Sequence, residues 1–208
     1  AAARRPAIRR DASYLVTGGL GGLGLRIAGW LAAQGAGQLV LIGRSGASTA
    51  QQQQAVAALA GHGTQVKVVQ ADVADARQVA AVLGQIAHSG LPLAGVFHAA
   101  AVLDDGLLAQ QTAARIRRVM APKAVGALLL HQLTRDLPLD FFVLYSSIAG
   151  LIGSPGQGNY AAANTLLDAL AHARRQQGLA GLSIDWGAFS DVGLAAERDS
   201  RGMRLASR

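Results

Sequence analysis

The sequence contains no cysteine, and aromatic residues make up only 4% of it. Without cysteine there is no disulfide framework and no thiolate metal site, which fits a reducing compartment. The five histidines are scattered without metal-ligand spacing, so we expect no metal site. No apolar run is long enough to cross a bilayer, and no apolar signal segment follows the arginine-rich N-terminus. We therefore predict a cytoplasmic protein without a membrane partner.

The net charge of +7 lies mainly at the two ends of the chain. Residues 1–10 hold four arginines, and residues 197–208 hold four arginines against Glu197 and Asp199, which leaves +1 for the part between. A nucleic-acid-binding surface needs basic residues along a folded face, with aromatic or groove-reading elements. The pattern favours solvated ends, and we predict no nucleic-acid partner.

Apolar runs rich in strand-forming residues alternate with helical periodicity from residue 13 to residue 186. With 208 residues, 51% of them hydrophobic, the chain can bury one substantial core. The alternation predicts an α/β fold, a Rossmann-like doubly wound parallel sheet with helices on both faces. The expected strands are Ser13–Thr17, Gln38–Ile42, Thr64–Val69, Leu93–Phe97, Leu139–Tyr145 and Gly181–Trp186, and the expected helices are the second half of 18–36, then 48–60, 75–88, 112–134 and 158–177.

The periodicity fades after Gly187, where no further strand signal is seen. We therefore expect a basic linker at 1–11, one folded domain at 12–190 and a lid or mobile linker at 191–208. The last strand and helix of such a sheet are expected to be missing, which would leave an unpaired edge and a risk to independent folding.

Residues 17–24 read TGGLGGLG between the first expected strand and the first expected helix. Glycines let the backbone approach a pyrophosphate closely, and a helix N-terminus offers free N–H groups and a positive dipole end. The pattern predicts a dinucleotide-binding loop; the alternative is a glycine-rich turn that packs the helix on the strand. The residues proposed for this loop are Thr17, Gly18, Gly19, Leu20, Gly21, Gly22, Leu23 and Gly24.

The residues at the end of the second strand indicate whether a bound dinucleotide would be NADH or NADPH. An acidic residue there would bind a ribose 2′-hydroxyl, but this chain has Arg44 and Ser45, which suit a 2′-phosphate. We therefore predict NADPH as the cofactor. The alternative is that Arg44 is a solvated turn residue.

Two further strand ends are candidates for cofactor contacts. Asp72, with Val73 beside it, could accept a hydrogen bond from the adenine amino group; the alternative is that Asp72 caps the following helix. His98, Ala99 and Ala100 end the fourth strand with mostly small side chains, which would let a cofactor ribose lie against the backbone.

The segment 145–164 reads YSSIAGLIGSPGQGNYAAAN and combines a hydroxyl pair, a glycine-rich loop, a tyrosine and an asparagine. A strand delivers Ser146 and Ser147 to its start, and a helix begins near Tyr160. Because Tyr160 and Asn164 are four residues apart, they should share one helix face. The alternative is a serine turn, a flexible loop and a tyrosine packed on a core helix.

Together the motifs TGGLGGLG, GRSG, ADV, FHAAAVLDDG, Lys123, YSSIAG and GQGNYAAAN resemble the catalytic half of a ketoreductase domain from a modular polyketide synthase. These domains are complex-type short-chain dehydrogenase/reductases, and the likeness spans about residues 12–194. It implies that Ser147 holds the carbonyl and that Tyr160 donates the proton. It also implies that Asn164 stands where ordinary members have lysine, and that Lys123 supplies the lysine instead.

The chemistry of these four residues can be stated directly. A phenol with a pKa of about 10 exchanges protons poorly at neutral pH unless a cation stabilises the phenolate, so Lys123 and a cationic cofactor could lower the pKa of Tyr160. Ser147 and Tyr160 would polarise the ketone oxygen. Tyr160 would act as general acid, with Asn164 and Lys123 positioning a relay to solvent.

The resemblance also bears on stereochemistry. Leu103, Asp104 and Asp105 resemble the LDD loop of B-type ketoreductases, and Ile152 stands where A-type enzymes have tryptophan, which implies a D-configured 3-hydroxyacyl product. The alternative for Asp104 and Asp105 is helix capping ahead of Gly106.

As a whole, the resemblance implies NADPH-dependent reduction of a 3-oxoacyl thioester held by phosphopantetheine on an acyl carrier protein. The implied partners are the carrier protein and other domains of a multidomain synthase, including a missing N-terminal structural subdomain. One rival is a free-standing short-chain reductase of small ketones or sugars. A rival from another class is a non-catalytic structural domain with a reductase fold.

Overall fold

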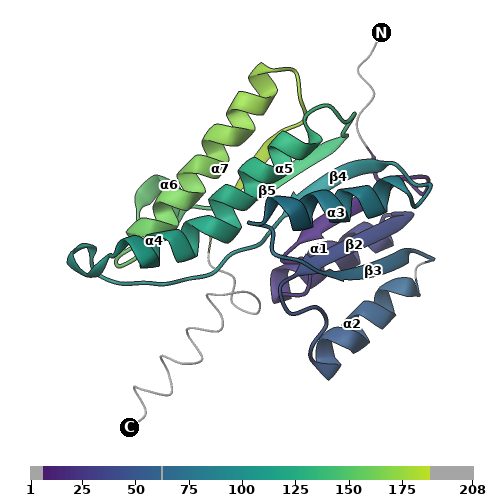
Figure 1. Cartoon of the computed structure of the whole chain (residues 1–208), viewed down its shortest axis with the longest axis horizontal. Helices are drawn as coiled ribbons and strands as arrows, with labels where there is room; N and C mark the ends of the chain where they lie inside the picture. The colour runs from purple at the N-terminus through teal and green to yellow at the C-terminus, as the bar shows by residue number, and fades with distance from the viewer. Residues whose placement is uncertain (1–6, 62, 188–208) are drawn as a thin grey trace.

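The described part of the computed structural model, residues 7–61 and 63–187, is built on one six-stranded parallel sheet. The spatial order of the strands is β3-β2-β1-β4-β5-β6. Helices cover the sheet on both faces (Figure 1). The predicted Rossmann-like doubly wound fold is therefore confirmed. The strands are β1 (Ser13–Thr17), β2 (Gln38–Gly43), β3 (Gln65–Gln70), β4 (Leu93–His98), β5 (Phe141–Ser147) and β6 (Leu182–Trp186).

The helices follow the expected alternation with the strands. The α-helices are α1 (Gly22–Ala33), α2 (Ala50–Ala60), α3 (Ala76–Ala87), α4 (Ala113–Met120), α5 (Gly126–Thr134), α6 (Ala149–Ile152) and α7 (Gly158–Gln176). Two further elements are the 3₁₀ turn η1 (Leu108–Gln110) and the π-helical turn η2 (Ala121–Val125).

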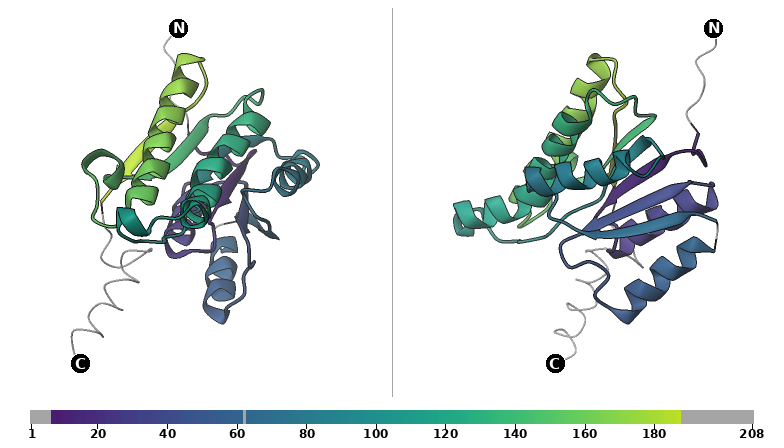
Figure 2. Two further views of the ribbon diagram at one scale, coloured as in Figure 1. Left: turned by 60° about the vertical axis from the view of Figure 1, so that its left-hand side comes forward. Right: turned by 45° about the vertical axis from the view of Figure 1, so that its right-hand side comes forward.

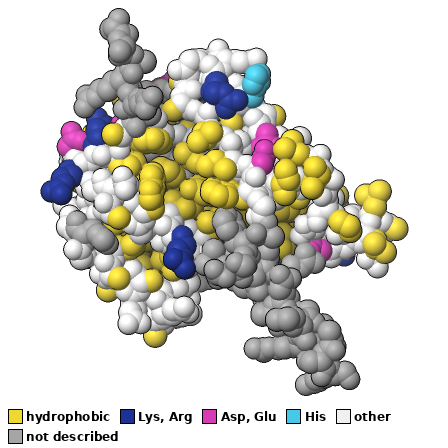
Figure 3. Space-filling model, turned by 180° about the vertical axis from the view of Figure 1, so that it is seen from behind, with side chains coloured by type: hydrophobic (Ala, Val, Ile, Leu, Met, Phe, Trp, Pro, Cys, Tyr) yellow, Lys and Arg dark blue, Asp and Glu magenta, His cyan; other side chains and the backbone are white. Residues whose placement is uncertain are grey.

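Two hydrophobic clusters lie on opposite faces of the sheet, because successive strand side chains point to opposite sides. Leu15 belongs to the cluster beneath α3, α5 and α7, whereas its neighbours Tyr14 and Val16 belong to the cluster beneath α1 and α2. Figure 2 shows these two helical layers with the sheet between them. On the side seen from behind Figure 1, hydrophobic side chains gather in the middle of the face (Figure 3).

The strand order reverses at β1, which lies between β2 and β4. Thr17, the last residue of β1, is level with Ile42 of β2 and His98 of β4. The loops after these three strands therefore leave the same edge of the sheet. In open parallel sheets this crevice is the usual ligand-binding place.

Three local features differ from the sequence prediction. The helix expected at 112–134 is interrupted by the π-turn η2 between α4 and α5. Strand β5 begins two residues later than predicted and runs through Ser147, so both serines lie in the strand. The loop after it contains the short helix α6, which was not predicted, and the Ser147 hydroxyl accepts a hydrogen bond from Ala149 N at 3.2 Å as this helix begins.

The predicted linker 1–11 is described from residue 7 onward, and its described part contacts the domain. The Arg9 backbone N–H donates to the Tyr14 hydroxyl at 2.7 Å, and the Arg9 guanidinium pairs with Asp140 at 3.4 Å. The predicted lid at 191–208 lies outside the described residues. Within residues 7–61 and 63–187, no helix is long and apolar enough to cross a membrane, and no cluster of metal-binding side chains occurs.

Candidate active site

The glycine motif between β1 and the start of α1 has no room for a side chain at two positions. Gly18 has a φ of +62°, and a Cβ there would lie 2.9 Å from the backbone of Ala100. A Cβ on Gly24 would lie 2.1 Å from the Gly18 carbonyl oxygen. Helix α1 begins at Gly22 after the N-cap residue Gly21, and no described side chain caps it. The loop therefore presents bare backbone and a helix N-terminus, which fits a pyrophosphate.

A cavity of about 160 Å³ opens beyond the carboxyl ends of the central strands. Five of the predicted cofactor residues line it, and six more residues line it that the prediction did not assign. Two of the latter could have been found from their positions, because Gly43 ends β2 and Ala71 directly follows β3. The predicted residues are Gly18, Arg44, Asp72, Val73 and Ala100, and the others are Ile42, Gly43, Ala71, Ala101, Val102 and Pro122.

Asp72 is partly exposed in this cavity and does not cap a helix. Its carboxylate accepts from Ala74 N at 2.9 Å, whereas the N-cap of α3 is Asp75, which accepts from Arg77 N at 2.9 Å. The capping alternative for Asp72 was therefore wrong.

Gln52 connects the two loops that would hold the cofactor phosphates, a role the sequence did not reveal. Its Nε2 donates to the Leu20 carbonyl at 3.0 Å, and its Oε1 accepts from Thr49 N at 3.1 Å. It thus ties the glycine loop to the segment after β2, where Arg44 and Ser45 are exposed. The other predicted loop residues pack differently, since Leu20 is buried and Leu23 is partly buried against the core.

Thr17, His98 and Ala99 lie outside the residues that line the cavity. Thr17 and His98 are fully buried at the ends of β1 and β4, and their side chains contact each other. Ala99 N donates to the Thr17 carbonyl at 3.1 Å, which continues the pairing of the two strands. Their contribution to a cofactor site would come through the backbone around them.

Lys123 and Tyr160 lie together beside the carboxyl end of β5. Lys123 is 3% exposed, its Nζ donates to the Tyr145 carbonyl at 2.9 Å, and Nζ lies 4.9 Å from the centroid of the Tyr160 ring. Burial lowers the pKa of Lys123 from 10.5 to about 8, and the negative charge of Asp168 opposes this shift. The sequence separated these residues by a strand and a loop, and the fold brings them into contact.

Burial raises the pKa of the Tyr160 phenol above its ordinary value of 10.0. Asn164 and Ser147 lower this pKa and Asp105 raises it, but burial is the largest cause. Our expectation that Lys123 lowers the pKa of Tyr160 is thus not met in the chain without cofactor. The phenol keeps its proton at neutral pH, which suits a proton donor.

Ser147 and Asn164 complete the group. The Ser147 oxygen accepts from Ala149 N at 3.2 Å, which leaves its own hydroxyl proton to donate elsewhere. Asn164 is fully buried; its Nδ2 donates to the Tyr160 carbonyl at 2.8 Å, and its Oδ1 has no hydrogen-bond partner among the described residues. Ser146 is buried and donates to the Asn164 carbonyl at 3.3 Å, so it supports the site from within.

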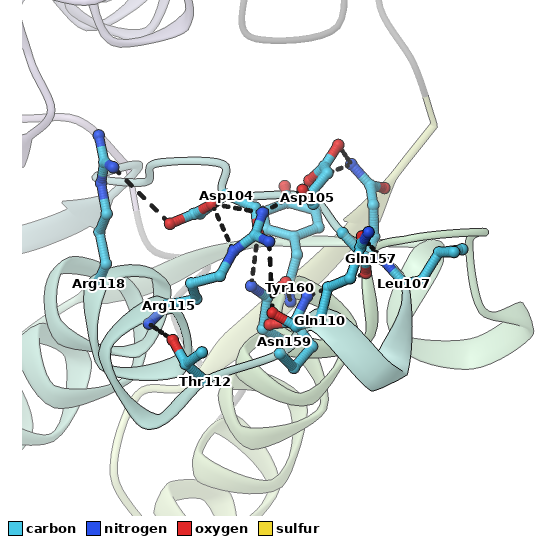
Figure 4. A network of polar contacts seen from close by, with 12 residues as sticks. Asp104, Asp105, Leu107, Gln110, Thr112, Arg115, Arg118, Gln157, Asn159 and Tyr160 are labelled. Atoms are coloured by element: carbon cyan, nitrogen blue, oxygen red, sulfur yellow. Dashed lines mark hydrogen bonds and ion pairs between the residues drawn. The ribbon is translucent and has the colours of Figure 1, made fainter.

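The loop at 103–106 is fastened to the start of α7 (Figure 4). Asp104 accepts from Arg115 Nε at 2.9 Å and pairs with Arg118 at 3.7 Å. Asn159 links this loop to the tyrosine, because its Nδ2 donates to the Asp104 carbonyl at 2.8 Å and its Oδ1 accepts from Tyr160 N at 2.7 Å. Arg115 and Asn159 were not predicted, since no local pattern joins them to Asp104.

The neighbouring aspartate is held in the same way. Gln157 Nε2 donates to the Asp105 carboxylate at 3.1 Å, and Gly106 N donates to the Gly156 carbonyl at 2.8 Å. The capping alternative for Asp104 and Asp105 was wrong, because the N-cap of α4 is Thr112. Leu103, the first residue of this loop, is partly buried, whereas Ile152, on α6, is 77% exposed.

Comparison with known proteins identifies related sequences. A family model described as the KR domain matches residues 12–191. The phthioceranic/hydroxyphthioceranic acid synthase of Mycobacterium tuberculosis is 46% identical over 185 residues, which cover 89% of this chain and 9% of that protein. The mycocerosic acid synthase-like polyketide synthase of the same species is 47% identical over 187 residues, which cover 90% of this chain and 9% of that protein. The chain thus spans about 9% of the length of these curated relatives.

Solved structures with the same arrangement are also found. One described as the structure of A-type ketoreductases from a modular polyketide synthase matches with a TM-score of 0.90 and 42% identity, covering 97% of this chain and 42% of that chain. The first ketoreductase of the tylosin PKS matches with a TM-score of 0.81 and 40% identity, covering 94% of this chain and 42% of that chain.

Proposed function

The chain belongs to the KR domain family, the ketoreductase domains of polyketide synthases, and on this premise we propose that it reduces a 3-oxoacyl thioester carried on an acyl carrier protein. Domains of this kind are NAD(P)H-dependent oxidoreductases. The observation that carries the proposal is the pairing of the buried Lys123 with the partly buried Tyr160, with Nζ 4.9 Å from the centroid of the ring. A protonated phenol beside a buried amine is suited to proton donation.

The residues around the cavity fit a dinucleotide. The bare backbone at Gly18 and Gly24 would hold the pyrophosphate, and Asp72 would bind the adenine amino group. We infer NADPH in particular, because the exposed cation Arg44 lines the cavity at the end of β2 and can pair with a 2′-phosphate. When bound, the cofactor supplies the hydride that reduces the ketone.

The side chains of the chain itself would handle the ketone oxygen and the proton. Ser147 has a hydroxyl proton free to donate, and with Tyr160 it would polarise the ketone and stabilise the developing alkoxide. Tyr160 then donates its phenolic proton to that oxygen. Lys123 is placed to return a proton to Tyr160, and Asn164 Oδ1, which has no partner among the described residues, would accept a hydrogen bond within the relay to solvent.

We infer a D-configured product from the loop that holds Leu103, Asp104 and Asp105. This loop is tied to the residue before Tyr160 through Asn159, so it lies where it can direct the approach of the acyl chain. Product analysis against a chiral standard tests this assignment, and a predominantly L-configured alcohol would contradict it.

The proposed partners are the phosphopantetheine arm of the carrier protein and the other domains of a multidomain synthase. Their support is that the relatives are synthases many times longer than this chain. A rate on carrier-bound thioesters above that on free ketones would support the proposal. Equal rates on both would favour a free-standing reductase of small ketones.

The experiment that tests the proposed function is NADPH oxidation with a 3-oxoacyl N-acetylcysteamine thioester. Tyr160→Phe should lower kcat at least about 100-fold, because it removes the proton donor. The matched control is Tyr145→Phe, since Tyr145 lies in the same segment but its ring stacks on Trp186 at 6.1 Å between centroids. Equal rates for Tyr160→Phe and wild type would overturn the mechanism. NADPH binding without any reduction would instead favour a non-catalytic domain.

A further inference from the structure

His98 lies at the junction of the cofactor crevice and the helix that carries Lys123. It is the last residue of β4, is 1% exposed, and both of its ring nitrogens are in hydrogen-bonding contact. Nδ1 lies 2.7 Å from the Thr17 hydroxyl oxygen, and Nε2 lies 2.8 Å from the Lys123 carbonyl oxygen. The imidazole therefore bridges β1, immediately before the glycine loop, and the π-turn η2.

The partners of the ring determine its tautomer. A carbonyl oxygen only accepts, so Nε2 carries the proton and donates it to the Lys123 carbonyl. Nδ1 is then the acceptor, and the Thr17 hydroxyl donates to it. The Thr17 oxygen in turn lies 3.4 Å from Ala100 N, which donates to it. The hydrogen bonds therefore all run in one direction: Ala100 donates to Thr17, Thr17 donates to His98, and His98 donates to Lys123.

A neutral ring fits this chain of hydrogen bonds. An imidazolium would have two N–H donors, and the Thr17 hydroxyl would have to turn its own proton away from Nδ1 to accept from it. Burial lowers the pKa of His98 from 6.5 to about 4, which favours the neutral form at physiological pH. The geometry and the burial thus agree on a neutral imidazole with its proton on Nε2.

The turn that His98 contacts departs from a regular α-helix at Lys123. Gly126 N donates to the carbonyls of both Ala121 and Lys123, and Pro122 within the turn has no N–H to donate. A Cβ on Gly126 would lie 2.9 Å from Val73 and 3.2 Å from the His98 ring. The absence of a side chain at Gly126 therefore lets the helix approach the imidazole closely enough for the hydrogen bond.

We propose that His98 is a positioning residue for the reduction: by holding the Lys123 carbonyl it fixes the π-turn and thereby the place of the Lys123 ammonium group against Tyr160. The two ends of Lys123 are held by different strands, the carbonyl by His98 of β4 and Nζ by the Tyr145 carbonyl of β5 at 2.9 Å. Releasing one end lets the lysine move relative to the tyrosine. The expected effect of His98 on the reduction rate rests on the proposed function, whereas its effect on the position of Lys123 does not.

The first test compares His98→Leu, which removes both hydrogen bonds, with His98→Gln, whose amide can still donate and accept. His98→Leu should lower kcat by about tenfold to 100-fold with the KM for NADPH changed less than about threefold, since a small misplacement of a catalytic group has this effect. His98→Gln should recover much of the loss. A rise in KM with kcat unchanged would overturn the proposal and make His98 a cofactor-binding residue. A wild-type kcat in His98→Leu would also overturn it.

The second test does not depend on activity, and the chain provides its own control. It has only two lysines, Lys123 and the exposed Lys67 of β3, so a protein with ¹⁵N in its lysine side chains gives two Nζ signals. In His98→Leu the Lys123 signal should shift while the Lys67 signal stays in place. An unmoved Lys123 signal would overturn the proposal even if the proposed reaction proved wrong.

A third measurement uses the wild-type protein and covers the case in which His98→Leu does not fold. Histidine ¹⁵N spectra should show His98 as the neutral tautomer with the proton on Nε2. A proton on Nδ1 would overturn the proposed direction of the hydrogen bonds, because the Lys123 carbonyl would then have no donor from the ring.

Discussion

Two buried cations lie at opposite ends of β5, and they are held very differently. Lys123 is 3% exposed near the carboxyl end of the strand, and Arg174 is 1% exposed near the amino end. Burial lowers the pKa of both, that of Lys123 to about 8 and that of Arg174 to about 10. Burial is the largest cause for both groups, and what sets them apart is their partners.

Arg174 has several partners that fix it in place. Its Nε donates to the Ala180 carbonyl at 2.6 Å, a terminal nitrogen donates to His131 Nδ1 at 2.9 Å, and the guanidinium lies 3.8 Å from the centroid of the Phe142 ring. Lys123 donates to one carbonyl among the described residues and otherwise faces Tyr160. The cation at the amino end holds elements together, whereas the cation at the carboxyl end has N–H groups that no described protein group accepts from.

The largest effect that would sharpen this comparison is expected from Lys123→Met, which keeps the length of the side chain and removes the ammonium group. The reduction rate should fall at least about 100-fold, because the proton returned to Tyr160 loses its source. NADPH oxidation with the thioester substrate measures this. A loss of less than about threefold would show that Lys123 is as purely structural as Arg174.

The same variant should be more stable than wild type. The pKa of Lys123 is 10.5 in the unfolded chain and about 8 in the folded protein. Protonation of Lys123 therefore lowers the free energy of unfolding: this stability is fully present above pH 10.5 and is lost as the pH falls through about 8. At pH 7 the buried ammonium thus costs about 3 kcal/mol of unfolding free energy, which Lys123→Met would regain in part. Urea unfolding without cofactor measures it, and a less stable variant would contradict the argument.

Arg174→Met should have the opposite consequences. Arg174→Met also removes a buried charge, but it leaves the Ala180 carbonyl and His131 without their donor and removes the contact with Phe142. Because these partners outnumber those of Lys123, the free energy of unfolding should fall by about 1–3 kcal/mol. The kcat of the folded variant should stay within about threefold of wild type, because the site lies at the other end of the strand. Urea unfolding and the thioester assay measure the two quantities. A large loss of kcat at a temperature where the variant is folded would break the comparison.

The smallest effect concerns His131, which must be neutral at Nδ1 to accept from Arg174. Burial, then the charges of Arg174 and Arg135, lower the pKa of His131 below 6.5. The neutral His131 ring therefore contributes to the free energy of unfolding above pH 6.5, and this contribution is lost as the pH falls through the lowered pKa of the ring. His131→Gln keeps an acceptor that does not titrate and should reduce the loss of stability between about pH 7 and pH 5 by less than about 1 kcal/mol. An unchanged pH dependence would contradict this.

The comparison also separates what the sequence could predict from what it could not. The strands and the glycine loop were predictable because their signals are local: the glycines from Gly18 to Gly24 lie between the end of β1 and the first turn of α1. The resemblance supplied Lys123 and Tyr160, and the fold confirms that they lie together. The placement of the other predicted residues around a bound cofactor stays a prediction.

The unpredicted features depend on contacts between distant parts of the chain. His98 contacts Thr17 across 81 positions and Lys123 across 25, and Asp104 reaches Arg115 across 11. The π-turn was missed because residues 112–134 have the apolar pattern of one helix, and the interruption is stabilised by a ring on another strand. Packing decides such features, and periodicity does not encode them.

The π-turn also sets the rotational phase of the helix that contains it. Each residue of an α-helix turns the chain by about 100°, so the extra residue in η2 rotates everything after it relative to α4. Deleting one residue from Ala121–Val125 would therefore turn Ala127 and Leu130, which are both fully buried, away from the core. The number of residues between Met120 and Gly126 is thus as strictly constrained as their identity, and homologous chains should vary in length in the loops and not here.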